Sequence, residues 1–299
     1  AGNLARPSFL FTSDANIQNF SDTQKSLYAG ARFSLADDLH WIVGARMLSL
    51  DASGDSYGSD YYTRAHGKVT PYTGLVYDLD KQWSVYGSWT KIYSAQYNLG
   101  ADGKLLAPLE GKSMEAGVKG SLLDNRLNLT AAAFKTEQQN VAEYAGLVDG
   151  RYVYNPMDYK SHGVELQASG EALPGLDLLG GYTYVRIDND DGDRARKYVP
   201  THSVRGMLTY RLPSLPKAKV GTRVSWQSAV ENDNNSAIRQ NAYALLDFMA
   251  SYDIDSNWST SVNLNNVTDR KYLLSLYNSA TTASYGAPRN VVASVTWKY

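Results

Sequence analysis

Residues 258–265 read WSTSVNLN and alternate, one by one, between two kinds of side chain. Trp258, Thr260, Val262 and Leu264 share one parity, while serine and asparagine fill the positions between them. Because successive side chains of an extended strand point to opposite faces, this period of two predicts a strand with one apolar face and one polar face.

The same alternation recurs along most of the chain. About thirteen segments fit the template, and most are about ten to twelve residues long. A tilted strand needs that length to cross a bilayer, whereas strands of soluble proteins average about five or six residues. This length favours a transmembrane barrel over a soluble sandwich. The segments are 24–35, 40–50, 67–79, 83–93, 112–122, 127–137, 159–170, 176–187, 202–212, 218–228, 243–254, 258–265 and 289–299.

The connections between these segments alternate in length. The short ones are 36–39, 80–82, 124–126, 171–175, 213–217 and 255–257, and the long ones are 51–66, 94–111, 138–158, 188–201, 229–242 and 266–288. Outer-membrane barrels have this pattern, with short periplasmic turns and long extracellular loops. The sequence therefore predicts an all-β fold, an antiparallel transmembrane β-barrel meander. Residues 1–23 lack alternation and are expected to form one more extracellular loop, and no internal domain boundary is evident.

The polar and aromatic residues also fit a membrane wall. One strand face carries Glu115 and Lys119 and another carries Arg205 and Arg211, although a midplane Arg or Lys facing lipid costs about 2–4 kcal/mol. These faces are therefore expected to line a watery or plugged lumen. The aromatic residues near strand ends suggest two interfacial girdles, although tyrosine and tryptophan favour any sheet. They are Trp41, Trp83, Trp258, Trp297 and Tyr299 on the short-turn side, and Trp89, Tyr184 and Trp226 on the long-loop side.

Composition excludes several classes of function. Lys plus Arg number 29 and Asp plus Glu number 30, for a net charge of −1, so charge gives no reason to expect a nucleic-acid partner. The chain has no cysteine, which excludes disulfides, thiolate metal sites and cysteine nucleophiles. No apolar run approaches the roughly 18–20 residues of a membrane helix. The first residues show no signal peptide and no initiating Met, so we expect a fragment of a longer protein.

Neither a metal site nor a catalytic site is predicted. The four histidines lack metal-ligand spacing. In the acidic segment 188–193, Gly192 falls one position too early for a calcium loop, so a solvated acidic loop is favoured over surface calcium that bridges to lipopolysaccharide. No G-x-S-x-G elbow is present, and Glu115 and Glu165 lie mid-strand, where cationic side chains can pair with them. We therefore expect no enzyme and no resident cofactor.

The C-terminal residues resemble a known family. Residues 263–272 (NLNNVTDRKY) resemble the N-L-x-N-[LV]-x-D-[RK]-x-Y stretch near the end of TonB-dependent receptors, and residues 285–290 (YGAPRN) resemble the Y-G-x-P-R motif that opens their last strand. The motif residues are Asn266, Asp269, Tyr272, Tyr285, Gly286, Pro288 and Arg289. The alternating Val295, Trp297 and terminal Tyr299 resemble the signal that the barrel-assembly machinery reads.

Upstream segments are similar to the siderophore branch of that family, which includes ferric coprogen and ferripyoverdine receptors. They are 69–78, 83–90, 111–120, 125–134 and 137–141. The family has an N-terminal plug domain and a barrel of 22 strands, and neither a plug nor a TonB box is recognisable in this sequence. The resemblance thus implies that residues 24–299 are the C-terminal portion of the barrel. An odd number of strands cannot close as an antiparallel barrel, so we expect a curved, open sheet.

The resemblance implies an outer-membrane receptor that imports a ferric siderophore, with its C-terminus in the periplasm. Implied partners are the siderophore, the TonB–ExbB–ExbD complex acting through the plug, outer-membrane lipid and lipopolysaccharide, and the barrel-assembly machinery. Candidate ligand-binding residues are Arg46, Tyr97, Arg223 and Gln227, because Arg can grip anionic oxygens and Tyr offers flat contact with a hydroxyl. The same residues could instead pair with plug carboxylates or stiffen loops. A passive porin without energised gating remains the alternative function, and a soluble β protein is disfavoured by the motifs.

Overall fold

Strands and the connections between them make up all of the chain that the structure describes. The computed structural model describes residues 18–56, 60–276 and 283–299, and no helix long and apolar enough to cross a membrane occurs among them. Thirteen strands form one antiparallel sheet in the order β1-β2-β3-β4-β5-β6-β7-β8-β9-β10-β13-β14-β17. Their bounds are β1 Gln18–Ser34, β2 Leu39–Ser56, β3 Asp60–Asp78, β4 Trp83–Ser94, β5 Leu109–Leu122, β6 Leu127–Val148, β7 Arg151–Leu173, β8 Leu176–Asn189, β9 His202–Arg211, β10 Ala218–Gln227, β13 Tyr243–Asp253, β14 Trp258–Asn265 and β17 Asn290–Trp297.

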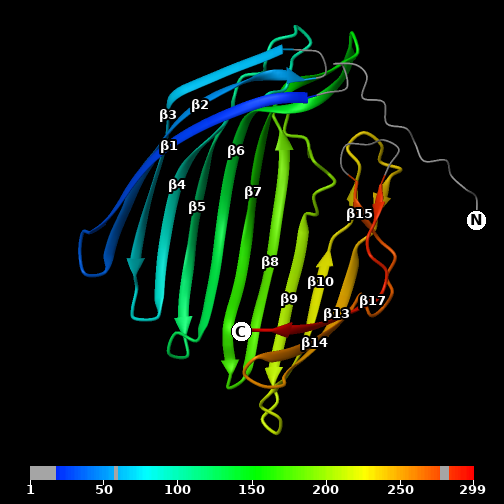
Figure 1. Ribbon diagram of the computed structural model, residues 1–299. Coiled ribbons are helices and arrows are strands. Elements are labelled where there is room, and N and C mark those ends of the chain that lie inside the picture. The colour runs from blue at the N-terminus through cyan, green and yellow to red at the C-terminus, as the bar shows by residue number, and fades with distance from the viewer. Residues whose placement is uncertain (1–17, 57–59, 277–282) are drawn as a thin grey trace, which may run out of the picture.

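The sheet is curved and open. Each main strand pairs with its neighbours in sequence order, and β1 and β17 form the two edges without pairing with each other in the described ranges. Figure 1 shows the strands side by side as a curved wall, with the loop-ward parts of β1, β2 and β3 bent over its top. This confirms the expected all-β meander and its open form. The short pairs β11 (Val230–Glu231) with β12 (Arg239–Gln240) and β15 (Leu273–Ser275) with β16 (Ser284–Tyr285) lie in the connections.

The two ends of the wall differ in their connections. We call the end that carries the short connections the turn end, and the opposite end the loop end. The turn-end connections are 35–38, 79–82, 123–126, 174–175, 212–217 and 254–257. The connections 95–108, 190–201, 228–242 and 266–289 lie at the loop end.

Several strands are longer at the loop end than the sequence pattern predicted. The predicted loop 138–158 is wrong, because β6 and β7 continue as a hairpin and leave only residues 149–150 as the turn. Asp149 and Gly150 both adopt positive φ angles of 50° and 77°, which suits a two-residue Asp-Gly hairpin turn. The predicted loop 51–66 is likewise largely strand, formed by the ends of β2 and β3.

The predicted N-terminal loop needs the same correction. Residues 18–23 belong to β1, and residues 1–17 lie outside the described part of the chain. The physical reason is common to all these extensions. Ladder hydrogen bonds continue beyond the membrane region, but both faces there can meet water, so side chains no longer need to alternate and the period of two fades.

One face of the wall is apolar across the strands. The pairing register carries a single row through eight adjacent strands, composed of Val85, Val118, Ala131, Leu166, Tyr182, Val204, Trp226 and Ala244. Leu166 in this row is 50% exposed, so no second layer of protein covers it. We call this side the apolar face. Its uncovered state fits contact with lipid, and the described residues do not form a dry interior between two sheets.

The opposite side, the polar face, carries the intervening residues. The adjacent row on that side is Ser84, Lys119, Thr130, Gln167, Gly181, Arg205, Ser225 and Leu245. Two of these residues are cations, whereas the apolar row has none. The single sheet therefore separates an apolar environment from a polar one, as the alternation predicted.

Most buried side chains gather at the loop end. The buried apolar residues among those described are Leu48, Leu50, Ala52, Ala65, Val153, Tyr159, Ala218, Val230 and Leu276. All except Ala218 lie in the loop-end parts of strands or in the loop-end connections. Packing of the chain against itself is therefore concentrated above the wall, and this layer positions the candidate site.

Candidate functional site

The polar face carries cross-strand pairs of charged and hydroxyl groups. Lys219 on β10 pairs with Asp177 on β8 at 3.1 Å. The hydroxyl of Tyr86 donates to Glu115 Oε1 at 2.5 Å, and the ammonium group of Lys119 lies 4.5 Å from the centre of the Tyr86 ring. These side chains give the face a charged, hydrogen-bonding surface suited to an aqueous passage.

The structure places two of the four predicted ligand residues together. Arg223 and Gln227 lie on the polar face of β10, four positions apart. Nε of Arg223 donates to Asp247 Oδ2 at 2.6 Å, while the Arg223 side chain stays 61% exposed. The hydroxyl of Tyr243 donates to Gln227 Oε1 at 3.2 Å. Arg223 thus keeps its exposed end toward the passage.

The other two predicted ligand residues lie elsewhere. Arg46 is on β2, separated from β10 by seven strands, and it donates from Nε and Nη2 to Ser26 Oγ at 3.3 and 3.1 Å. Tyr97 lies in the β4–β5 connection, and its hydroxyl donates to Asp22 Oδ2 on β1 at 3.0 Å. A ligand role for all four residues stays a prediction.

Asn266 lies at the centre of a buried hydrogen-bond network at the loop end, which we call the Asn266 network. Its backbone N–H donates to Asp247 Oδ1 at 2.7 Å, and its side chain accepts from the Arg270 N–H at 2.8 Å. Its Nδ2 donates to the carbonyl oxygens of Arg270 and Ala287 at 2.9 and 3.1 Å. Asn266 is 4% exposed and has a φ of 49°, a left-handed conformation that Asn tolerates better than most residues.

Other motif residues fasten the same connection. The Arg289 N–H donates to Asp269 Oδ1 at 3.0 Å, and the Gly286 N–H donates to the Tyr272 carbonyl at 2.9 Å. The Tyr272 ring fills the space where a Cβ on residue 286 would lie, so any side chain there would displace the ring. Tyr272 also stacks on Tyr243, with ring centroids 4.7 Å apart.

The remaining motif residues are placed at the surface. The carbonyl of Pro288 accepts from Asn290 Nδ2 at 2.9 Å, and Tyr285 in β16 is exposed. The motif residues therefore connect β13, the end of β14 and the start of β17 through hydrogen bonds. Asp247 joins the Asn266 network to Arg223, because one of its carboxylate oxygens accepts from the Asn266 N–H and the other accepts from Arg223 Nε.

The predicted assembly signal lies at the turn end. Trp297 packs against Trp258 and Tyr299, with ring centroids 6.2 and 5.5 Å apart. Val295 pairs with Thr260 on the apolar face and is exposed. The arrangement presents an aromatic edge at the end of the chain, and its recognition by the assembly machinery stays a prediction.

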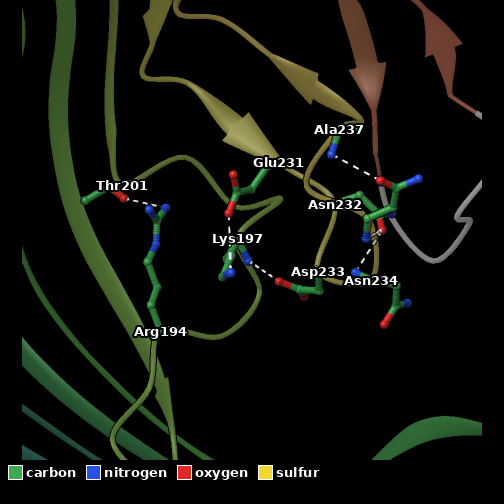
Figure 2. Close-up of polar contacts among 9 residues, drawn as sticks. Arg194, Lys197, Thr201, Glu231, Asn232, Asp233, Asn234 and Ala237 are labelled. Atoms are coloured by element: carbon green, nitrogen blue, oxygen red, sulfur yellow. Dashed lines mark hydrogen bonds and ion pairs between the residues drawn. The ribbon is translucent and has the colours of Figure 1, made fainter.

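Figure 2 shows how two loop-end connections hold each other. Lys197 reaches Glu231 through its ammonium group at 3.3 Å, and its backbone N–H donates to Asp233 Oδ1 at 2.7 Å. Asn232, which is 2% exposed, accepts from the N–H groups of Asn234 and Asn235. Its Nδ2 donates to the Leu276 carbonyl at 2.7 Å and so links a third connection.

A second cluster ties the 190–201 connection to the β6–β7 hairpin. Arg196 donates from Nη2 to Glu143 at 2.5 Å and from Nη1 to the Tyr198 hydroxyl at 2.8 Å. Its guanidinium carbon lies 4.5 Å from the centre of the Tyr159 ring. A φ of 50° at Arg196 is unusual for a residue with a side chain, so these contacts hold the backbone in a strained position.

The β4–β5 connection joins the same layer. Gln96 Nε2 donates to the carbonyl oxygens of Ala107 and Asn140, and the Tyr154 N–H donates to the Leu99 carbonyl at 2.8 Å. The connections at the loop end therefore form one hydrogen-bonded sheath, which we call the loop layer. No local sequence pattern marks Asp247, Asn232, Asn140 or Arg196, because their partners are distant in the chain.

Two of the aspartates in the acidic segment 188–193 form ion pairs. Asp188 pairs with Arg186 at 2.7 Å, and Asp190 pairs with Lys160 at 3.3 Å. Within the part of the chain that the structure describes, no group of three or more His, Asp or Glu side chains is placed to hold a metal ion.

Comparison with known proteins decides the family. The family model "TonB dependent receptor-like, beta-barrel" matches residues 2–267. The chain belongs to this family. It is 37% identical over its whole length to the ferric-pyoverdine BN7/BN8 receptor of Pseudomonas putida, covering 37% of that protein. It is 35% identical over 92% of its length to the ferripyoverdine receptor of Pseudomonas aeruginosa, covering 35% of that protein.

A solved receptor structure agrees with the sequence comparison. The crystal structure of the Pseudomonas aeruginosa ferripyoverdine receptor bound to ferripyoverdine matches 94% of this chain with a TM-score of 0.80 and 34% identity. The match covers 39% of that receptor, so this TonB-dependent receptor chain spans little more than a third of the relatives it matches. The resemblance read from residues 263–272 and 285–290 is confirmed, and these relatives are named as receptors for ferric pyoverdine or ferripyoverdine, not as enzymes.

Proposed function

We propose that this chain is the C-terminal part of the barrel of an outer-membrane receptor that imports a ferric siderophore of the pyoverdine class, with energy supplied through TonB. The observation that carries the proposal is the uninterrupted apolar face backed by a cation-bearing polar face, in a chain 37% identical to a ferric-pyoverdine receptor. The apolar face contacts lipid, and the polar face lines the passage.

The orientation follows from the two ends of the wall. The loop end faces the extracellular medium and supplies the vestibule, while the turn end and Tyr299 face the periplasm, as short turns do in bacterial barrels. TonB, with ExbB and ExbD, acts on the plug that TonB-dependent receptors carry before the barrel. Residues 24–299 belong to the barrel wall in this scheme.

The polar face of β10 offers the best ligand contact. A ferric chelate carries anionic oxygens, and the exposed end of Arg223 presents two Nη groups as a fork that suits them. Asp247 holds the inner Nε of that guanidinium, so the fork is oriented before the ligand arrives. Gln227 lies four residues closer to the loop end than Arg223, and together with Tyr243 it adds amide and aromatic contacts there.

Uptake by living cells tests the proposal. Cells that lack the gene should lose uptake of iron-55 presented as ferric pyoverdine, and restoring the gene should recover it only when TonB is present.

Arg223→Ala should weaken ferripyoverdine binding by about tenfold, because one charge-assisted contact is lost. Arg211→Ala, at the turn end of the polar face, is the matched control. Unchanged uptake of every ferric siderophore in the deleted strain would refute the receptor.

A passive porin would share the wall but not the energy requirement. The relatives named as siderophore receptors disfavour it. A swelling assay on liposomes that contain the purified protein distinguishes the two functions. Swelling in small sugars without TonB would indicate a porin. The absence of swelling, together with TonB-dependent uptake in cells, would support the receptor.

A further inference from the structure

Arg205 on the polar face has no partner within the wall. Four cations project from this face across β8, β9, β10 and β13, and three of them have acceptors in the chain. The acceptors are Asp177 for Lys219, Asp247 for Arg223 and the Pro216 carbonyl oxygen for Arg211. Arg205 is exposed, and no hydrogen bond or ion pair joins its guanidinium group to another described residue. Arg205 is therefore available to an anion from outside the wall.

The register places Arg205 beside Arg223. Arg205 on β9 pairs with Ser225 on β10, and Arg223 lies two positions from Ser225 on the same face. Such diagonal neighbours lie about 7–8 Å apart, within reach of two long side chains. Asp247 accepts from Nε of Arg223 at 2.6 Å, so one carboxylate faces two guanidinium groups. Like charges this close repel, and an anion bound between them would remove the repulsion.

The wall leaves room for an anion beside Arg205. Gly181 on β8 pairs with Arg205, and no side-chain atom lies within 4 Å of the position that a Cβ on Gly181 would occupy. Thr183 and Ser203 pair in the next row toward the loop end, and their hydroxyl groups add hydrogen-bonding capacity without charge. Glu165 pairs with Thr183 from the far side, on β7, and forms no ion pair with Arg205 among the described contacts.

The two guanidinium groups favour one kind of anion. A guanidinium group presents parallel N–H donors that match the two oxygens of a carboxylate. Asp247 occupies Nε of Arg223, so the Nη groups of Arg223 and the whole guanidinium group of Arg205 remain for the incoming group. The oxygens that ligate iron in a ferric chelate share their charge with the metal. A carboxylate that does not bind the iron is therefore the stronger acceptor for these arginines.

We infer that Arg205 and Arg223 together bind a free carboxylate of the ferric siderophore, one that does not ligate the iron. This contact determines which chelates the receptor accepts, and it makes Arg205 a specificity-determining residue. The inference rests on the proposed function, because it names the chemical group that the polar face of β9 and β10 recognises. Asp247 keeps Arg223 in position for the same group.

Binding of two matched chelates to the whole receptor, purified with its plug from outer membranes, tests the inference. The probes are a ferric pyoverdine with a free carboxylate and the same chelate with that carboxylate converted to a primary amide. The wild type should bind the acid about 30-fold more tightly than the amide, because charge-assisted hydrogen bonds are stronger than neutral ones. Arg205→Ala should bind the acid about tenfold more weakly, and its binding of the amide should change by less than about threefold.

A double-mutant cycle shows whether the two arginines hold the same group. R205A/R223A should bind the acid about 30-fold more weakly, less than the product of two tenfold losses, because both residues contact one carboxylate. Its preference for the acid should disappear. Arg205→Lys keeps the charge without the fork and should retain part of the preference. Arg211→Ala, six positions along β9 on the same face, is the matched control and should bind both chelates like the wild type.

Other outcomes would overturn the inference. Equal weakening of acid and amide binding by Arg205→Ala would show that Arg205 does not recognise a carboxylate. Single losses that multiply in the double variant would show that the two arginines hold separate groups. An unchanged preference for the acid, together with a lower unfolding temperature of the plug, would show that Arg205 pairs with a plug carboxylate instead.

The wild-type protein separates this test from that of the proposed function. Equal binding of the acid and the amide by the wild type would overturn the inference and leave the receptor function standing. A wild type that binds neither chelate would overturn the proposed function as well.

Discussion

The two ends of the wall are held by different kinds of contact. At the turn end, Asp80 accepts from the N–H groups of Gln82 and Trp83 at 2.7 and 2.8 Å. Asp255 does the same for the residues two and three positions after it, both at 2.8 Å. The same D-x-x-W turn thus occurs twice, and each copy is built from four consecutive residues.

The loop end depends on residues that are far apart in sequence. Asn232 binds the Leu276 carbonyl across 44 positions, and Arg196 binds Glu143 across 53. The two D-x-x-W turns therefore carry their own local hydrogen bonds, whereas the loop layer is specified by contacts that form only after the strands have paired. A local end should tolerate substitution, and a long-range end should lose several contacts at once.

The largest effect is expected from Asp247→Ala. This change leaves the buried N–H of Asn266 without its acceptor, which costs about 1–3 kcal/mol, and it frees Arg223, whose exposed pairing adds less. We expect the unfolding free energy to fall by about 3 kcal/mol in denaturant titrations of the detergent-solubilised protein. Hydrogen exchange should also rise in residues 266–276.

Asp253→Ala is the control for this change, because it removes a carboxylate from the same strand at the turn end. It should alter stability by less than about 0.5 kcal/mol. If the unfolding free energy falls no more for Asp247→Ala than for Asp253→Ala, the Asn266 network does not stabilise the loop end.

A smaller effect, about 2 kcal/mol, is expected from Asn232→Ala. Alanine leaves the Leu276 carbonyl and the N–H groups of Asn234 and Asn235 without their hydrogen-bond partner, at a position where Asn232 is only 2% exposed. Asn232→Asp keeps the acceptor oxygens but loses the Nδ2 donor, so it should fall between alanine and the wild type. Exchange rates in residues 233–238 should rise in the same order, and a flat response across the two variants would remove Asn232 from the loop layer.

The sequence predicted the parts of the molecule whose side chains experience two environments. Each strand core carries a period of two because one side meets lipid and the other meets a polar passage, so thirteen strands and their faces could be read directly. The signal faded where β6 and β7 leave that layer, although Asp149-Gly150 was a readable hairpin turn. The length of the flanking strands could not be inferred from the turn alone.

The candidate site was predicted less completely. Arg223 and Gln227 are two of the four predicted ligand residues, and the structure places them together because their spacing on β10 is local. Arg46 and Tyr97 were grouped with them by residue type, and the strand order separates them. Asp247 was not predicted, since its importance arises from Asn266, which is 19 positions away and reaches it only through the pairing of β13 with β14.

The smallest effect is expected at the turn end, from Asp255→Asn. The N–H groups of Asn257 and Trp258 hold the pKa of Asp255 below its usual value. A depressed folded-state pKa contributes stability that is present above the unfolded-state pKa of about 3.9, and this stability is lost as pH falls through the lower folded-state value. The Tm of the variant should therefore lie within about one degree of the wild type at pH 7, and the difference should vanish in acid. Asp80→Asn, in the matching turn, should behave alike at pH 7, because the same four-residue geometry is involved. A loss at either turn as large as that of Asp247→Ala would mean that the turns, too, depend on distant contacts, and the contrast between the two ends would fail.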